Sequence, residues 1–106
     1  MTEAGSPADE ARARAALAAA LELVGQRWAL PVVRELLGGA RRFGDLQRAL
    51  GAPTNILTTR LRELQEAGLV VRMPMAHNVL AYGLTRRGEA LAPALEALAR
   101  WGAGGD

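Results

Sequence analysis

Apolar side chains recur every three or four residues along much of this chain, which is the spacing of one face of an α-helix. The pattern predicts five helices, over residues 7–24, 27–37, 43–50, 54–67 and 86–101. Ser6 is placed to cap the first helix, with Pro7 at its first position. Pro31 falls inside the second, where it removes an N–H group, so that helix has to begin close upstream or bend there.

Two short apolar stretches follow the fourth helix and differ from it in pattern. Residues 69–73 and 79–84 predict two strands around a tip at residues 74–78. Two short helices around a tight turn, followed by a hairpin, form a winged helix-turn-helix. The expected fold is mainly α with a small β-hairpin wing and flanking dimerisation helices. The domain is expected to cover residues 7–101, between a flexible N-terminus at 1–6 and a flexible tail at 102–106.

The fourth predicted helix has two different faces. Leu57, Leu61 and Leu64 form an apolar stripe that requires a core. Short hydrogen-bonding groups and one guanidinium share another face, contributed by Asn55, Thr58, Thr59 and Arg62. Such side chains can enter a DNA major groove and read base edges, Arg at guanine and Thr at a thymine methyl. The alternative is an ordinary amphipathic surface helix with phosphate contacts or none.

Composition and charge narrow the functional class. All 13 basic residues are arginine, and against 11 acids the net charge is only +2. Eight of these arginines lie between residues 41 and 87 with only three acids, so positive charge gathers around the candidate recognition helix. The chain has no cysteine, no membrane-length apolar run and no signal-peptide pattern, so we expect a cytoplasmic bacterial protein without a membrane span.

Several further polar residues are candidates for DNA contact. Arg41 and Arg42 are either a phosphate clamp or a solvated surface pair. Thr54 and Asn55 begin the fourth helix, where free N–H groups favour a phosphate, although Thr54 alone can serve as a cap. His77, the only histidine, is either a wing-tip DNA contact or an exposed loop residue. We expect no metal site, no cofactor and no enzyme, because phosphate-loop, nucleophile and paired-ligand motifs are missing.

Five short motifs occur in an order that resembles a known family. Over about residues 17–101, the chain is similar to the HxlR-type transcriptional regulators in the segments Gly25–Trp28, Arg42–Leu46, Leu57–Leu61, Glu66–Val70 and Tyr82–Gly88. The resemblance implies a dimeric winged-helix protein that binds double-stranded DNA and pairs through its terminal helices. It also implies that Pro53, Thr54 and Asn55 open the recognition helix. Some members of the family sense oxidants through a cysteine.

The chain departs from this family pattern in three places. It has no cysteine, which removes thiol sensing; its wing is short and lacks arginine at the tip; and Pro31 lies within a helix. Any effector must therefore be a small apolar or aromatic molecule that binds reversibly, in the cleft between the terminal helices and the helix-turn-helix. The alternative is a constitutive DNA binder controlled by its own abundance.

Apolar residues in the terminal helices exceed what the helix-turn-helix core needs. We expect them to form a homodimer interface, made by Leu17, Leu21, Val24, Leu91, Leu95, Leu98 and Trp101. A two-fold dimer favours a palindromic site. The function expected is a sequence-specific transcriptional regulator, a dimeric repressor that reads its operator with the helix at 54–67. The alternative is a winged-helix module that binds protein without specific DNA binding.

Overall fold

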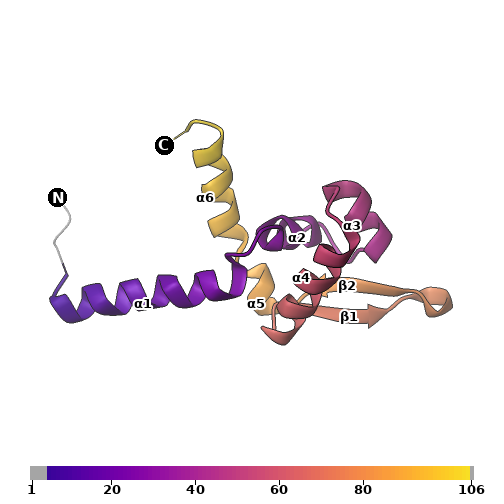
Figure 1. Ribbon diagram of the computed structural model, residues 1–106, viewed down its shortest axis with the longest axis horizontal. Helices are drawn as coiled ribbons and strands as arrows, with labels where there is room; N and C mark the ends of the chain where they lie inside the picture. The colour runs from indigo at the N-terminus through magenta and orange to yellow at the C-terminus, as the bar shows by residue number, and fades with distance from the viewer. Residues whose placement is uncertain (1–4, 106) are drawn as a thin grey trace.

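The computed structural model describes residues 5–105 (Figure 1). Its helices are α1 (Pro7–Val24), α2 (Ala29–Leu36), α3 (Phe43–Leu50), α4 (Thr54–Glu66), α5 (Arg86–Glu89) and α6 (Ala92–Gly102). Strands β1 (Val70–Pro74) and β2 (Leu80–Leu84) flank a short 3₁₀ turn, η1 (Ala76–Asn78). Residues 1–4 of the segment expected to be flexible, and residue 106 of the tail, lie outside the described residues.

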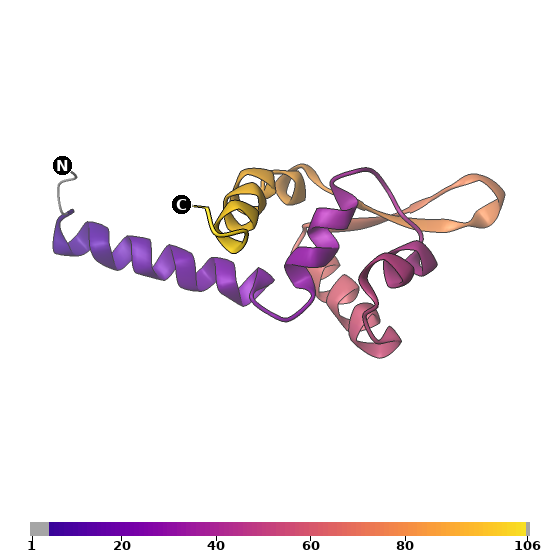
Figure 2. The same cartoon turned by 90° about the horizontal axis from the view of Figure 1, so that it is seen from above.

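Helix α1 begins at the predicted cap. The Ser6 hydroxyl accepts a hydrogen bond from the Asp9 N–H at 3.1 Å, and Pro7 occupies the first turn. The helix then projects away from the rest of the chain, and its side chains from residue 7 to residue 22 are all exposed (Figures 1 and 2). Only its last residue, Val24, is buried.

Helix α2 begins two residues later than predicted. Trp28 adopts a left-handed backbone conformation with φ of 78°, which a continuous helix from residue 27 does not allow. The first helical residue is therefore Ala29. Pro31 then lies in the first turn, where its missing N–H breaks no intrahelical bond. The helix ends at Leu36, one residue earlier than predicted, and Leu37 is 37% exposed.

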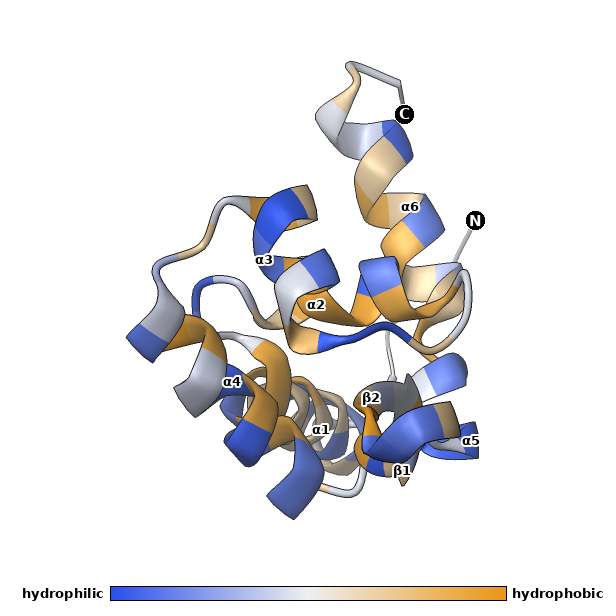
Figure 3. Ribbon diagram, turned by 90° about the vertical axis from the view of Figure 1, so that its right-hand side faces the viewer, coloured by the Kyte–Doolittle hydropathy of each residue, from blue (hydrophilic) through white to orange (hydrophobic). Residues whose placement is uncertain are grey.

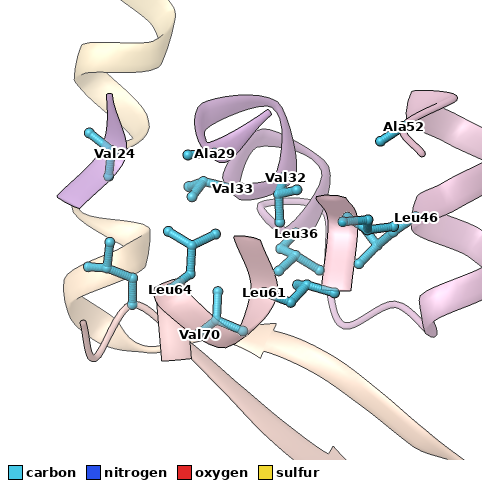
Figure 4. Close-up of a cluster of buried hydrophobic side chains, with 12 residues drawn as sticks. Val24, Ala29, Val32, Val33, Leu36, Leu46, Ala52, Leu61, Leu64 and Val70 are labelled. Atoms are coloured by element: carbon cyan, nitrogen blue, oxygen red, sulfur yellow. The ribbon is translucent and has the colours of Figure 1, made fainter. Parts of the chain in front are cut away.

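Helices α2, α3 and α4 enclose one hydrophobic core with the base of the wing (Figure 4). The core comprises Val24, Ala29, Val32, Val33, Leu36, Leu46, Ala52, Leu57, Leu61, Leu64, Leu69 and Val70. Helix α3 has its predicted bounds, and α4 ends one residue earlier than predicted. Gly51 and Gly68 follow these two helices with φ of 70° and 79°, which glycine adopts without strain. The Gly51 turn connects α3 to α4, and the Gly68 turn connects α4 to β1.

The two strands pair in an antiparallel hairpin, as predicted. Val70 lies opposite Leu84, and Pro74 lies opposite Leu80. A short bridge adds Arg41 to the outer side of β2, through two backbone hydrogen bonds with Tyr82 at 2.9 and 2.8 Å. The hairpin extends from the body of the domain as a wing (Figure 1).

The last predicted helix is wrong as a single element, because the structure contains two. Thr85 caps α5 by accepting from the Gly88 N–H at 3.1 Å, but α5 ends at Glu89. Pro93 has no N–H to donate to the Glu89 carbonyl, and its ring would clash with that group in a continuous helix. Helix α6 therefore starts afresh with Pro93 in its first turn, and it runs one residue beyond the predicted end.

No single helix in the described part of the chain is long and apolar enough to cross a membrane. Helices α1 and α2 reach that length and apolar character only when taken together, and the chain bends by 78° between them.

Candidate nucleic-acid interface

The predicted division of α4 into two faces is present in the structure. Leu57, Leu61 and Leu64 are at most 1% exposed and pack into the core. Asn55, Thr58 and Arg62 are exposed, and Thr59 is partly exposed. Around α4, hydrophobic and hydrophilic residues alternate in the same way (Figure 3). One helix thus anchors itself by its leucines and presents polar groups to the surroundings.

The two arginines of α4 have different surroundings. Arg60 donates from Nε to the Arg27 carbonyl at 2.8 Å and from Nη1 to Glu63 at 3.1 Å. It therefore ties α4 to the segment before α2. Arg62 makes no ion pair within 4.0 Å among residues 5–105, although Arg60 and six other arginines do. Its guanidinium donors are therefore free to bind an external acceptor.

The first turn of α4 is attached to α3 by a contact that the sequence pattern does not predict. The Gln47 side-chain amide donates to the Thr54 hydroxyl. Further along the helix, the Thr58 and Thr59 hydroxyls donate to the carbonyls of Thr54 and Asn55, both at 2.9 Å. Gln47 thus helps to position the candidate recognition helix. Its role depends on how α3 and α4 pack, so no local motif could have identified it.

Arg41 and Arg42 are neighbours in the chain but point into different parts of the domain. Arg41 lies 3.7 Å from Glu35 and lines a cavity between α2 and α6. Arg42 lies 3.3 Å from Asp45, and its own N–H donates to the same carboxylate at 3.3 Å, which caps α3. The structure therefore separates the predicted pair: Arg42 lines a hollow with the tip of the wing, whereas Arg41 pairs with the wing through its backbone and lines the cavity beside α6.

Two of the candidate DNA contacts come together at the wing. Arg42 and His77 line the same surface hollow of about 420 Å³, together with Ala40, Asp45, Met75, Ala76 and Val79. His77 is exposed, and its positive φ of 61° departs from helical geometry within η1 at the tip of the wing. Pro53, which precedes α4, is also exposed. The wing tip and the start of α3 thus form one continuous surface.

Asp45 links pH to this surface. Its hydrogen bond from the Arg42 side chain is the main reason that its pKa lies below the ordinary value of 3.8. Because the folded state lowers this pKa, the capping contribution is complete above about pH 4 and is lost as the pH falls through the lowered folded-state value. We expect Asp45→Asn to lower the melting temperature at pH 7, and this difference from the wild type to shrink as the pH falls below the ordinary pKa of the carboxylate, in paired thermal melts. A difference that does not change with pH would show that the carboxylate charge is not involved.

The predicted dimer residues divide into exposed and packed groups. Leu17, Leu21, Leu98 and Trp101 are between 49% and 72% exposed. Leu91 and Leu95, by contrast, are half-buried against the core. Val24 is buried within the core itself, so the expectation that it lies outside the core is wrong. Val24 is the last residue of α1, and it packs into the hydrophobic core where the chain turns toward α2.

A family model described as HxlR-like helix-turn-helix matches residues 23–104. The chain belongs to this family. Among its relatives, the uncharacterised HTH-type transcriptional regulator Rv3095 of Mycobacterium tuberculosis is 47% identical over 85 residues, which are 78% of this chain and 54% of the relative. This HxlR-like chain thus spans about half the length of that relative.

Two solved structures extend the comparison to the fold. A proposed MarR-family transcriptional regulator from Enterococcus faecalis is 37% identical, with a TM-score of 0.75 over 86% of each chain. The quinone-bound YodB from Bacillus subtilis is 27% identical, with a TM-score of 0.71 over 83% of the HxlR-like chain and 94% of YodB. The expected fold class and family are both confirmed.

Proposed function

We propose that this HxlR-like chain is a DNA-binding transcriptional repressor that acts as a homodimer in the bacterial cytoplasm. It reads a palindromic operator with the exposed face of α4. The observation that supports this most directly is Arg62, whose guanidinium lies exposed among Asn55, Thr58 and Thr59 and forms no ion pair with the described residues. The regulators among its relatives support the same proposal.

A protein-binding role is less consistent with α4. Surfaces that bind proteins centre on buried aromatic and apolar anchors. The outer face of α4 instead carries an amide, two hydroxyls and a guanidinium. These groups match the donors and acceptors on base edges in a major groove.

Selection from a random duplex library tests the proposal. We expect the recovered sequences to contain an inverted repeat whose half-sites are about 34 Å apart, one turn of DNA, because a two-fold dimer presents two copies of α4. Recovered sequences without any shared motif would contradict specific DNA reading. A shared motif without two-fold symmetry would contradict the dimer but not the use of α4.

The exposed apolar residues of the terminal helices support the dimer. Helix α1 is Ala- and Leu-rich from residue 15 to residue 21, and this stretch is exposed throughout. Leu17, Leu21, Leu98 and Trp101 add large apolar side chains on α1 and α6. Apolar surface of this extent on a small protein marks an interface. A second copy supplies the same helices and can cover it.

A cavity between α2 and α6 is the proposed site for a small effector with an apolar or aromatic body. It has a volume of about 460 Å³ and is lined by Arg34, Glu35, Leu37, Gly38, Arg41, Ala92, Leu95, Glu96 and Ala99. Arg41 connects this cavity to the wing, because its side chain lines the cavity and its backbone pairs with Tyr82. If the chain around Arg41 can occupy more than one place relative to α6, a ligand that binds more tightly to one of these arrangements would shift the protein toward it, and would move the wing and α3 as well.

Such an effector has to act without thiol chemistry, because the chain has no cysteine. Operator binding is therefore expected to survive diamide or a quinone at doses that inactivate a cysteine-bearing relative. A mobility-shift assay with each reagent measures this directly, with the relative as a positive control. Rapid loss of binding that a thiol reverses would refute this expectation.

A further inference from the structure

The hydroxyl groups of Thr58 and Thr59 have a fixed hydrogen-bond direction in this structure. Each donates its only proton to a backbone carbonyl one turn earlier, at 2.9 Å. A hydroxyl has one donor and two acceptor lone pairs. With the proton engaged inside the helix, each hydroxyl offers only acceptors to a molecule outside.

The Thr54 hydroxyl has the opposite hydrogen-bond direction. It already accepts from the Gln47 amide, so its proton is available for an external acceptor. Thr54 lies at the first position of α4, where the free N–H groups also favour an anion. Thr54 is therefore suited to a phosphate, which accepts hydrogen bonds but carries no sequence information.

The outer part of α4 thus combines a donor with two acceptors. Arg62 offers donors only. It lies three residues after Thr59 and four after Thr58, so the three side chains lie within about one turn of the helix. In a major groove, guanine presents acceptors, while only the amino groups of adenine and cytosine present donors.

We propose that Thr58 and Thr59 determine specificity by accepting a hydrogen bond from an adenine N6 or cytosine N4 amino group, beside a guanine bound by Arg62. This assignment rests on the DNA-binding function proposed above. The alternative is that these threonines only touch a thymine methyl. If a threonine hydroxyl donated to a base instead, it would lose its bond to the helix carbonyl. That loss would weaken the DNA-binding constant roughly two- to twelvefold.

Base analogues test the assignment on the operator that the selection recovers. Purine in place of adenine, or 2-pyrimidinone in place of cytosine, removes the amino group; uracil in place of thymine removes the methyl. Each modified duplex is titrated against the wild type and against Thr→Val and Thr→Ser variants at positions 58 and 59. Valine keeps the methyl without the hydroxyl, and serine keeps the hydroxyl without the methyl.

Removal of the amino group at the contacted base is expected to weaken wild-type binding about tenfold. The Thr→Val variant at the contacting position should bind the parent and amino-free duplexes equally, whereas the Thr→Ser variant should keep the difference. Both positions are at least partly exposed, and circular dichroism verifies that each variant folds. The ratio of the affinities for the two duplexes is compared between the wild type and each variant, which cancels any effect of the analogue on the DNA itself.

Two results would overturn the assignment in distinguishable ways. Specific binding that is insensitive to amino removal, or that loses its preference with serine and keeps it with valine, would show methyl contact or no contact by these threonines. DNA reading by α4 would survive that result. A wild-type protein without preference for any duplex would instead overturn the proposed function, and the assignment with it.

Discussion

Arg62→Ala is expected to weaken binding to the best operator by about 1–3 kcal/mol and to relax the choice of base at one position in each half-site. The Arg62 guanidinium lies on the exposed face of α4 and forms no ion pair with residues 5–105. Its removal therefore deletes donors to DNA without releasing a buried acid. The measurement is a set of titrations against the operator and its single-base variants. Unchanged affinity and unchanged base preference would show that α4 does not read the groove through this residue.

Two matched arginine variants separate charge from base reading. Arg42→Ala removes a cation near the wing and is expected to weaken all sequences similarly, with a salt dependence reduced by about one unit of slope. Arg100→Ala removes the same charge from the exposed end of α6, far along the chain from α4. It is expected to leave base preference unchanged. A loss of preference in Arg100→Ala would mean that the Arg62 effect is only long-range charge.

Leu98→Glu and Leu17→Glu are each expected to convert the dimer into a monomer and to reduce operator affinity roughly 100-fold or more, because each recognition helix then binds alone. Both leucines are exposed, at 49% and 62%, so a charge there does not disturb the core of one protomer. Leu95 is a poorer choice, since it packs partly against that core. Sedimentation at micromolar concentration measures the assembly, and titration measures the affinity.

Leu80→Glu is the control for these variants. Leu80 is 46% exposed, like Leu98, but it lies on β2 in the wing rather than on a terminal helix. The Leu80→Glu variant is expected to remain dimeric. A wild-type monomer, or a Leu98→Glu variant that dimerises normally, would contradict an interface through α6.

The elements that the sequence predicted well are those with local signals. Helices α3 and α4 begin and end at or within one residue of the predicted positions, because Gly51, Pro53 and Gly68 mark their ends. The last helix was mispredicted because leucine spacing continued across Pro93, and the spacing outweighed the effect of the missing N–H. The start of α2 depends on the left-handed conformation of Trp28, which no propensity favours.

The candidate site was predictable only in part, for a related reason. The two faces of α4 follow from helical periodicity, and the structure separates them as expected. The directions of Arg41 and Arg42 depend on Glu35 and Asp45, which lie on different helices. The bond between Gln47 and Thr54 depends on how two helices pack. Such contacts are set by tertiary structure, so the sequence pattern does not reveal them.

A titration of the protein with the DNA upstream of its own gene, at two salt concentrations, tests specific DNA binding most directly. A scrambled duplex of equal length and composition is the reference. We predict that the upstream DNA binds at least about 1,000-fold more tightly than the reference, and that affinity for both falls as salt rises. Equal affinity for the two duplexes at both salt concentrations would contradict a sequence-specific regulator acting on its own promoter.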